Sequence, residues 1–153
     1  AMSHTRCRSL PGSSYGFTLI ELMIVIVIVA VLVAIALPAY QNQIQRTNRT
    51  ATQADMMAAA QAMEKYYGIN FTYSGAAAGT TFPNEAPSDT PNKRYDISLS
   101  SISATTYTIR ATPKAGSGQE GDGFMTLNYL GQRSWDKNDN NSTADADEDN
   151  WSR

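Results

Sequence analysis

An uninterrupted apolar run near the start of the chain dominates the pattern of hydrophobic and polar positions. The run extends from Leu22 to Leu37 without a charged or polar side chain. With Phe17–Glu21 before it and Pro38–Tyr40 after it, the stretch has about 24 residues, enough for an α-helix to cross a hydrocarbon layer of roughly 30 Å. The sequence therefore predicts a membrane-spanning helix.

Helical periodicity continues beyond Pro38, which is expected to kink the helix because proline lacks an amide donor and crowds the preceding turn. Small and hydrophobic residues then recur at intervals of three and four, which predicts one apolar face. This face comprises Tyr40, Ile44, Thr47, Ala51, Ala54, Ala58, Ala62 and Tyr66. Gly68 is expected to end the helix, which then runs from Phe17 to Tyr67 over roughly 75 Å.

Two groups of side chains on this helix have structural interpretations. Met63, Tyr66 and Tyr67 are expected to pack in the core at the end of the helix. Arg46 and Arg49 lie one turn apart and are expected on a solvated or headgroup-facing surface, because long basic side chains keep their charged ends in water.

Three later segments alternate apolar with polar residues, as half-buried strands do. They contain Tyr95, Ile97 and Leu99, then Tyr107, Ile109 and Ala111, and finally Met125, Leu127 and Tyr129. Residues 74–92 and 113–123 are rich in Gly, Ser, Thr or Pro, which predicts a long irregular connection and a flexible hairpin connection. The pattern predicts an α+β fold, with the long helix packed on a small antiparallel sheet of three or four strands.

Positive charge precedes the apolar run, because His4, Arg6 and Arg8 lie upstream and no acid precedes Glu21. The positive-inside rule therefore keeps the N-terminus in the cytoplasm and sends the rest of the chain across the membrane. The run has three interpretations: a secretory signal peptide cut after Ala36, a simple one-span anchor, or a helix in which Glu21 has a function. The first two leave the acidic residue unexplained.

Glu21 requires a nearby cation, because an unpaired carboxylate at the edge of a membrane helix costs a few kcal/mol. A cut between Gly16 and Phe17 would create an α-amine four residues before Glu21, on the same helical face. The carboxylate also faces the positive end of the helix dipole. Pairing within the chain would let the helix stay in lipid, and pairing with a neighbour's amine would guide one subunit to dock beside another.

The segment Gly16-Phe17-Thr18-Leu19-Ile20-Glu21-Leu22, with its long apolar continuation, resembles the leader and N-terminal helix of type IV pilins and of the related type II secretion pseudopilins. The resemblance includes the basic leader and Pro38 near the end of the apolar stretch. It implies a pilin fold with three parts: a leader (residues 1–16), a membrane and filament-core half of the helix (17–40), and a periplasmic globular domain (41–153).

The same resemblance implies a set of partners and locations. A prepilin peptidase would cut after Gly16 and methylate the amine of Phe17. Inner-membrane lipid would hold the helix until the pilus assembly machinery moved the subunit into an extracellular filament. There the helices of other pilin subunits would surround it, and Glu21 would neutralise a neighbouring N-terminus.

Composition excludes several classes of chemistry. The chain has 12 Lys and Arg against 14 Asp and Glu, and its single His and single Cys are His4 and Cys7. Removal of the leader would leave no imidazole or thiol, which excludes Cys/His catalysis, Cys/His zinc sites and disulfides. The sequence contains no phosphate-binding glycine loop or hydrolase motif, so we expect no enzyme. The lack of basic excess argues against nucleic acid as a tight ligand.

The last residues form an acidic segment with two interpretations. From Asp136 onward the chain carries six acids against two basic residues. One interpretation is a solvated tail kept open by like-charge repulsion. The other is a Ca²⁺ loop, with oxygen ligands from Asp136, Asn138, Asn140 and Asp147. Apart from Ca²⁺, we expect no cofactor.

Two details bear on the calcium interpretation. Asn141 stands where an EF-hand loop has glycine and Asp147 where it has glutamate, and no flanking helices are evident, which argues against an EF-hand. Trp135 and Trp151 bracket the segment and are expected to pack, which would bring the acids close together. Some pseudopilins carry calcium near this position, so the resemblance also favours a cation.

Many major pilins close their C-terminal region with a disulfide, and nothing after Cys7 can form one here. The residues Pro38-Ala39-Tyr40 and Glu64-Lys65-Tyr66-Tyr67 are most similar to minor pilins of the type IVa pilus. The resemblance therefore implies a structural minor pilin. A type II secretion pseudopilin and a DNA- or surface-binding tip module are the alternatives. The sequence does not distinguish tip from shaft, or adhesion from motility or DNA uptake.

Overall fold

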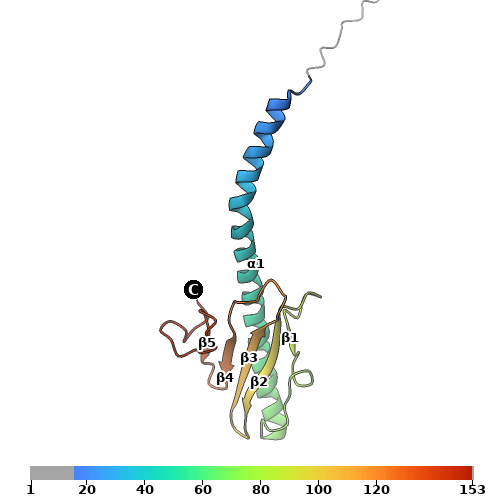
Figure 1. Ribbon diagram of the computed structural model, residues 1–153. Coiled ribbons are helices and arrows are strands. Elements are labelled where there is room, and N and C mark those ends of the chain that lie inside the picture. The colour runs from blue at the N-terminus through green and yellow to red at the C-terminus, as the bar shows by residue number, and fades with distance from the viewer. Residues whose placement is uncertain (1–15, 153) are drawn as a thin grey trace, which may run out of the picture. The chain divides into compact units, whose positions relative to one another are not determined.

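A long helix precedes a small sheet in the computed structural model, which describes residues 16–152 (Figure 1). The helix is α1 (Leu19–Asn70). The strands are β1 (Glu85–Ala86), β2 (Tyr95–Ile102), β3 (Tyr107–Pro113), β4 (Met125–Asn128) and β5 (Arg133–Trp135). The chain divides into two compact units after Pro38, and α1 contributes to both. The predicted leader, apart from Gly16, lies outside the described residues.

The helix begins at a capping residue. The Thr18 hydroxyl oxygen accepts a hydrogen bond from the amide of Glu21 (3.3 Å), as an N-cap side chain does for the third helical residue. Helix α1 therefore starts at Leu19, two residues later than predicted. The helix continues through Pro38 without interruption. The kink at Pro38 stays a prediction.

The predicted end of the helix at Gly68 was wrong. Helix α1 includes Gly68 and ends at Asn70. The next residue, Phe71, has a φ of 57°, and its amide donates to the carbonyl of Tyr67 (2.7 Å). A left-handed residue directly after the last turn is a common way to end a helix, and here a phenylalanine takes the conformation that glycine usually takes.

The sheet confirms the predicted α+β fold and adds strands to it. Its strands follow the sequence order from β1 to β5, and each neighbouring pair is antiparallel. The three predicted strands are β2, β3 and β4. The sequence missed β1 and β5, because strands of two and three residues are too short to show alternation.

The core lies between the sheet and the second half of α1. Alternate strand residues are buried as predicted, including Tyr95, Ile109 and Leu127, whereas Tyr129 lies beyond β4 and is exposed. The helix buries Arg49, Thr52, Met56, Ala59 and Met63.

The predicted apolar face of the helix was only partly right. Ala62 and Tyr66 pack partly buried against the core. Ala54 and Ala58 are exposed, because the fully buried face is rotated away from them. Met56 and Met63, both 0% exposed, bury far more apolar area than alanine, so the methionines determine which face turns inward. The prediction that Met63 lies in the core is confirmed, and Tyr66 and Tyr67 pack partly buried against it.

Candidate functional site

The residues predicted for processing lie at the start of the described chain. Gly16, Phe17 and Thr18 precede α1, and the Phe17 side chain is 78% exposed. Glu21 lies in the first turn, where the helix dipole favours negative charge. In the uncut chain Phe17 has no free amine, so its pairing with Glu21 stays a prediction.

The apolar first half of α1 has no partner within the described chain. Every residue from Phe17 to Leu37 is exposed. An 18-residue stretch of the helix has a mean hydropathy of 3.3 and none of it is buried, so its length and composition allow it to cross a membrane. A helix that is apolar all round requires lipid or other helices around it.

Arg49, which was predicted at a solvated surface, is instead buried in an ion pair. Its side chain and that of Asp122 are each 5% exposed. The Arg49 Nε atom donates to Asp122 Oδ2 (2.8 Å), and Nη2 pairs with Oδ1. The guanidinium group also stacks on the Trp135 ring, 3.8 Å from its centroid. Arg46 is exposed, as predicted.

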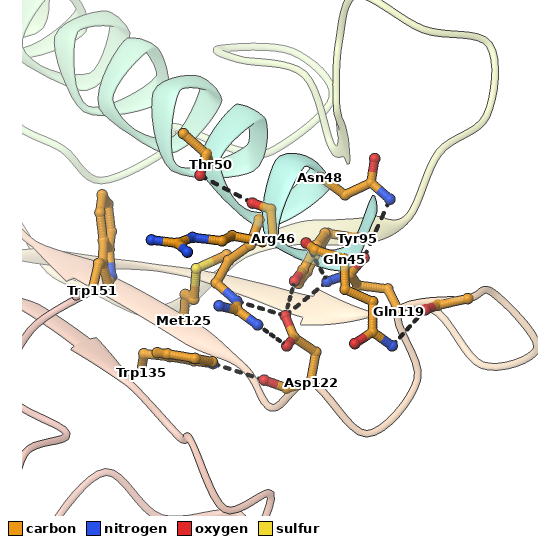
Figure 2. Close-up of polar contacts among 12 residues, drawn as sticks. Gln45, Arg46, Asn48, Thr50, Tyr95, Gln119, Asp122, Met125, Trp135 and Trp151 are labelled. Carbon is orange, nitrogen blue, oxygen red and sulfur yellow. Dashed lines mark hydrogen bonds and ion pairs between the residues drawn. The ribbon is translucent and has the colours of Figure 1, made fainter. Parts of the chain in front are cut away.

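Asp122 collects further hydrogen bonds, which Figure 2 shows converging on it. The Tyr95 hydroxyl donates to its carboxylate (2.5 Å), as does the side-chain amide of Gln119 (2.8 Å). The Trp135 indole N–H donates to its backbone carbonyl (2.7 Å). Burial, and after it the negative charge of Asp122, raises the pKa of Tyr95, which therefore remains a neutral donor.

These five residues, Arg49, Tyr95, Gln119, Asp122 and Trp135, form what we call the Arg49–Asp122 cluster. The cluster fastens the connection between β3 and β4 to α1, with a further bond from Gln119 to the carbonyl of Gln45 (3.0 Å). This connection was predicted as a flexible hairpin, but the structure buries three of its side chains, those of Gln119, Asp122 and Phe124. A pair of opposite charges far apart in the sequence gives no periodic signal, which is why sequence reasoning missed it.

The acidic segment is folded against the sheet. Trp135 is 1% exposed, and the Trp151 indole donates to the carbonyls of Thr126 (3.2 Å) and Ser134 (3.1 Å). The predicted packing of both tryptophans is therefore confirmed. Between them, the carboxylate of Asp136 is 0% exposed and accepts the backbone amides of Asn140 and Asn141.

The four predicted calcium ligands take different positions. The side-chain amides of Asn138 (2.9 Å) and Asn140 (2.6 Å) both donate to Asp145, and these bonds lower the pKa of Asp145. Asp147 is exposed, with a φ of 68°. The neighbouring Glu148 turns inward instead and is 2% exposed.

Across residues 16–152, no three Asp, Glu, His or Cys side chains gather where a metal ion would sit. Two of the four predicted ligands are asparagines, so the predicted calcium site stays a prediction. Asp147 and Glu148 are adjacent and both acidic, and Glu148, not Asp147, is the one that is buried. Only the local backbone decides which of them turns inward.

Comparison with protein families gives two matches. The model for the "prokaryotic N-terminal methylation motif" matches residues 12–37, which include Gly16, Phe17 and Glu21. The model for the "type IV minor pilin ComP, DNA uptake sequence receptor" matches residues 38–123, more than half of the chain. A search of curated proteins finds no match.

The chain is also similar to a solved structure, the non-core minor pilin PilV of Neisseria meningitidis, with 22% sequence identity and a TM-score of 0.53. The similarity covers 66% of this chain and 94% of the PilV chain, and it supports the pilin fold. The family matches favour a minor pilin over a secretion pseudopilin. This chain therefore belongs to the ComP family of type IV minor pilins and is a structural subunit of a type IV pilus.

Proposed function

We propose that this minor pilin is cut between Gly16 and Phe17, is methylated at the Phe17 amine, and is stored in the inner membrane with its globular domain in the periplasm. The match of residues 12–37 to the methylation motif is the observation that carries this proposal. The exposure of Gly16 and Phe17 ahead of the capped helix supports it, because a peptidase needs an extended, accessible segment. The basic residues before the apolar run support the orientation.

Glu21 would then serve the assembly step. The filament replaces lipid around the exposed apolar helix with the helices of other subunits. A carboxylate in that environment needs a cation, and the new amine of a neighbouring subunit supplies one. No other acidic residue occurs before Asp55, so Glu21 alone among the acids would lie within the helix bundle.

A block of processing tests this proposal. Gly16→Val should leave the uncut chain in the inner membrane and remove it from sheared filaments, because the peptidase acts beside this glycine. Gly68→Val is a matched control, since neither glycine has another group within 4 Å of an added Cβ atom. Quantitative mass spectrometry of the membrane and filament fractions measures both. Equal amounts of the Gly16 variant and the wild type in filaments would contradict the proposal.

DNA contact is a second candidate, because the matching family is described as a DNA uptake sequence receptor. The balance of basic and acidic side chains does not favour strong electrostatic binding of DNA. From Phe17 onward, ten Lys and Arg side chains stand against fourteen acids, since Arg6 and Arg8 lie in the leader. Several of the ten are already engaged: Arg49 pairs with Asp122, Lys114 with Glu85 and Asp96, and Arg110 stacks on Phe124.

We therefore expect weak DNA binding that falls steeply with salt. Fluorescence anisotropy of labelled duplexes with the detergent-solubilised chain, at 50 and 150 mM salt, measures it. Residual binding at 150 mM should be the same for a candidate uptake sequence and its scrambled version. Tight binding that prefers one sequence at 150 mM salt would instead establish the receptor function.

A further inference from the structure

A carboxylate oxygen without a partner is buried in the acidic segment. Glu148 is 2% exposed, and its Oε1 atom accepts the backbone amide of Lys137 (3.0 Å). Its Oε2 atom is buried and has no hydrogen-bond donor among the described residues. A buried acceptor that has lost its water without gaining a donor is unfavourable, and more so when it is charged.

Glu148 is bonded to the backbone on both sides of a second buried acid, Asp136. The amide of Trp135 donates to the Glu148 carbonyl (2.9 Å), and the amide of Lys137 donates to its side chain, so Glu148 contacts the residues on both sides of Asp136. Asp136 itself is 0% exposed. The loop therefore holds two buried acids at its two ends, and four further acids lie between or just beyond them.

No hydrogen bond or ion pair of the described basic side chains near this loop goes to a carboxylate of the loop. Lys137 Nζ donates to the backbone carbonyl of Asp147, not to a carboxylate. Arg49 pairs with Asp122, and Arg110 donates to the side-chain oxygen of Asn141 (3.0 Å). Among the described residues, no basic side chain compensates the unpartnered Glu148 oxygen, and a hard divalent cation would supply two positive charges at once.

We propose that the loop from Asp136 to Glu148 binds one Ca²⁺ ion. Asp136 and Glu148 would supply carboxylate oxygens, with the otherwise unpartnered Oε2 of Glu148 turned to the ion. Asn138 and Asn140 would supply amide oxygens once each side chain turns, since their nitrogens now point to Asp145. Ca²⁺ accepts six to eight oxygens of mixed type, so backbone carbonyls and water complete such a site.

This ligand set differs from the one predicted from spacing, because Glu148 replaces Asp147. It also agrees with the absence of a three-acid cluster in residues 16–152, since amide oxygens take part. The inference rests on the acidic segment alone and is independent of how the N-terminus is processed. Mg²⁺ is a poorer fit, because it demands near-octahedral geometry and retains its water.

Calorimetric titration of the detergent-solubilised full chain with Ca²⁺ tests the proposal. We expect one site with a Kd below about 1 mM, at least tenfold weaker binding for Glu148→Gln, and unchanged binding for Asp149→Asn, a matched change at an exposed neighbouring acid. Wild-type protein without Ca²⁺ binding at 5 mM, or a folded Glu148→Gln variant that binds as tightly as wild type, would overturn the site.

A second measurement on the wild type covers the case in which the Glu148 variant fails to fold. Tb³⁺ commonly occupies Ca²⁺ sites and emits when a nearby tryptophan is excited, and Trp135 directly precedes Asp136. We expect sensitised Tb³⁺ emission that Ca²⁺ suppresses and equimolar Mg²⁺ does not. No sensitised emission, or equal suppression by both ions, would also overturn the site.

Discussion

Filaments from cells that carry Glu21→Val in this chain are expected to contain at least tenfold less of the subunit than wild-type filaments, while its level in the inner membrane is unchanged. Valine suits lipid at least as well as glutamate does, so membrane storage is preserved. In the filament, however, the variant leaves a neighbour's new amine without its carboxylate among apolar helices. A tenfold loss corresponds to about 1.4 kcal/mol, less than the cost of one unpaired charge in hydrocarbon.

Two further variants separate charge from shape in this result. Glu21→Gln keeps the size of the side chain and removes the charge, so it should behave like Glu21→Val. Glu21→Asp keeps the charge and should retain most of the incorporation. Immunoblots of sheared filaments and membranes, normalised to the major subunit, measure each fraction. Wild-type incorporation of both the Val and Gln variants would exclude a role for the carboxylate.

Asp122→Ala is expected to destabilise the globular unit by about 3–5 kcal/mol, because it leaves the buried guanidinium of Arg49 without its partner. The substitution also leaves the Tyr95 hydroxyl and the Gln119 amide without the acceptor that now holds them. Denaturant unfolding in detergent, followed by tryptophan fluorescence, measures the change. The signal is suitable because Trp135 stacks against Arg49.

Asp89→Ala is the matched control, since Asp89 is an exposed acid, and its effect should stay within about 0.5 kcal/mol. The double variant Arg49→Met with Asp122→Ala should cost less than the two single changes added together, because it removes both charges. A loss below about 1 kcal/mol for Asp122→Ala alone would show that the ion pair does not hold the connection between β3 and β4 to the helix.

The sequence predicted those parts of the fold that depend on local, repeated patterns. The apolar run from Leu22 to Leu37 predicted the first half of α1. The alternation around Tyr95, Ile109 and Leu127 predicted three strands. The segment from Gly16 to Leu22 was recognisable because its signature lies in consecutive residues near one helix end. For the same reason, the family motif matches it as a continuous stretch.

The sequence could not predict features that depend on residues distant in the chain. Arg49 and Asp122 are 73 positions apart, and each alone is typical of a surface. The helix face was misjudged because a stripe of alanines has the right period, but only the packed sheet shows that Met56 and Met63 fill the core. Whether Glu148 or Asp147 turns inward depends on the local backbone conformation, in which Asp147 has a positive φ, and composition does not reveal this.

The intact mass of the subunit extracted from its native inner membrane, combined with N-terminal sequencing, tests the central claim most directly. The account predicts a chain that starts at Phe17, carries one methyl group on its amine and retains the whole apolar helix. A chain that still carries its first sixteen residues, or one that starts at Leu37 after loss of the helix, would contradict it.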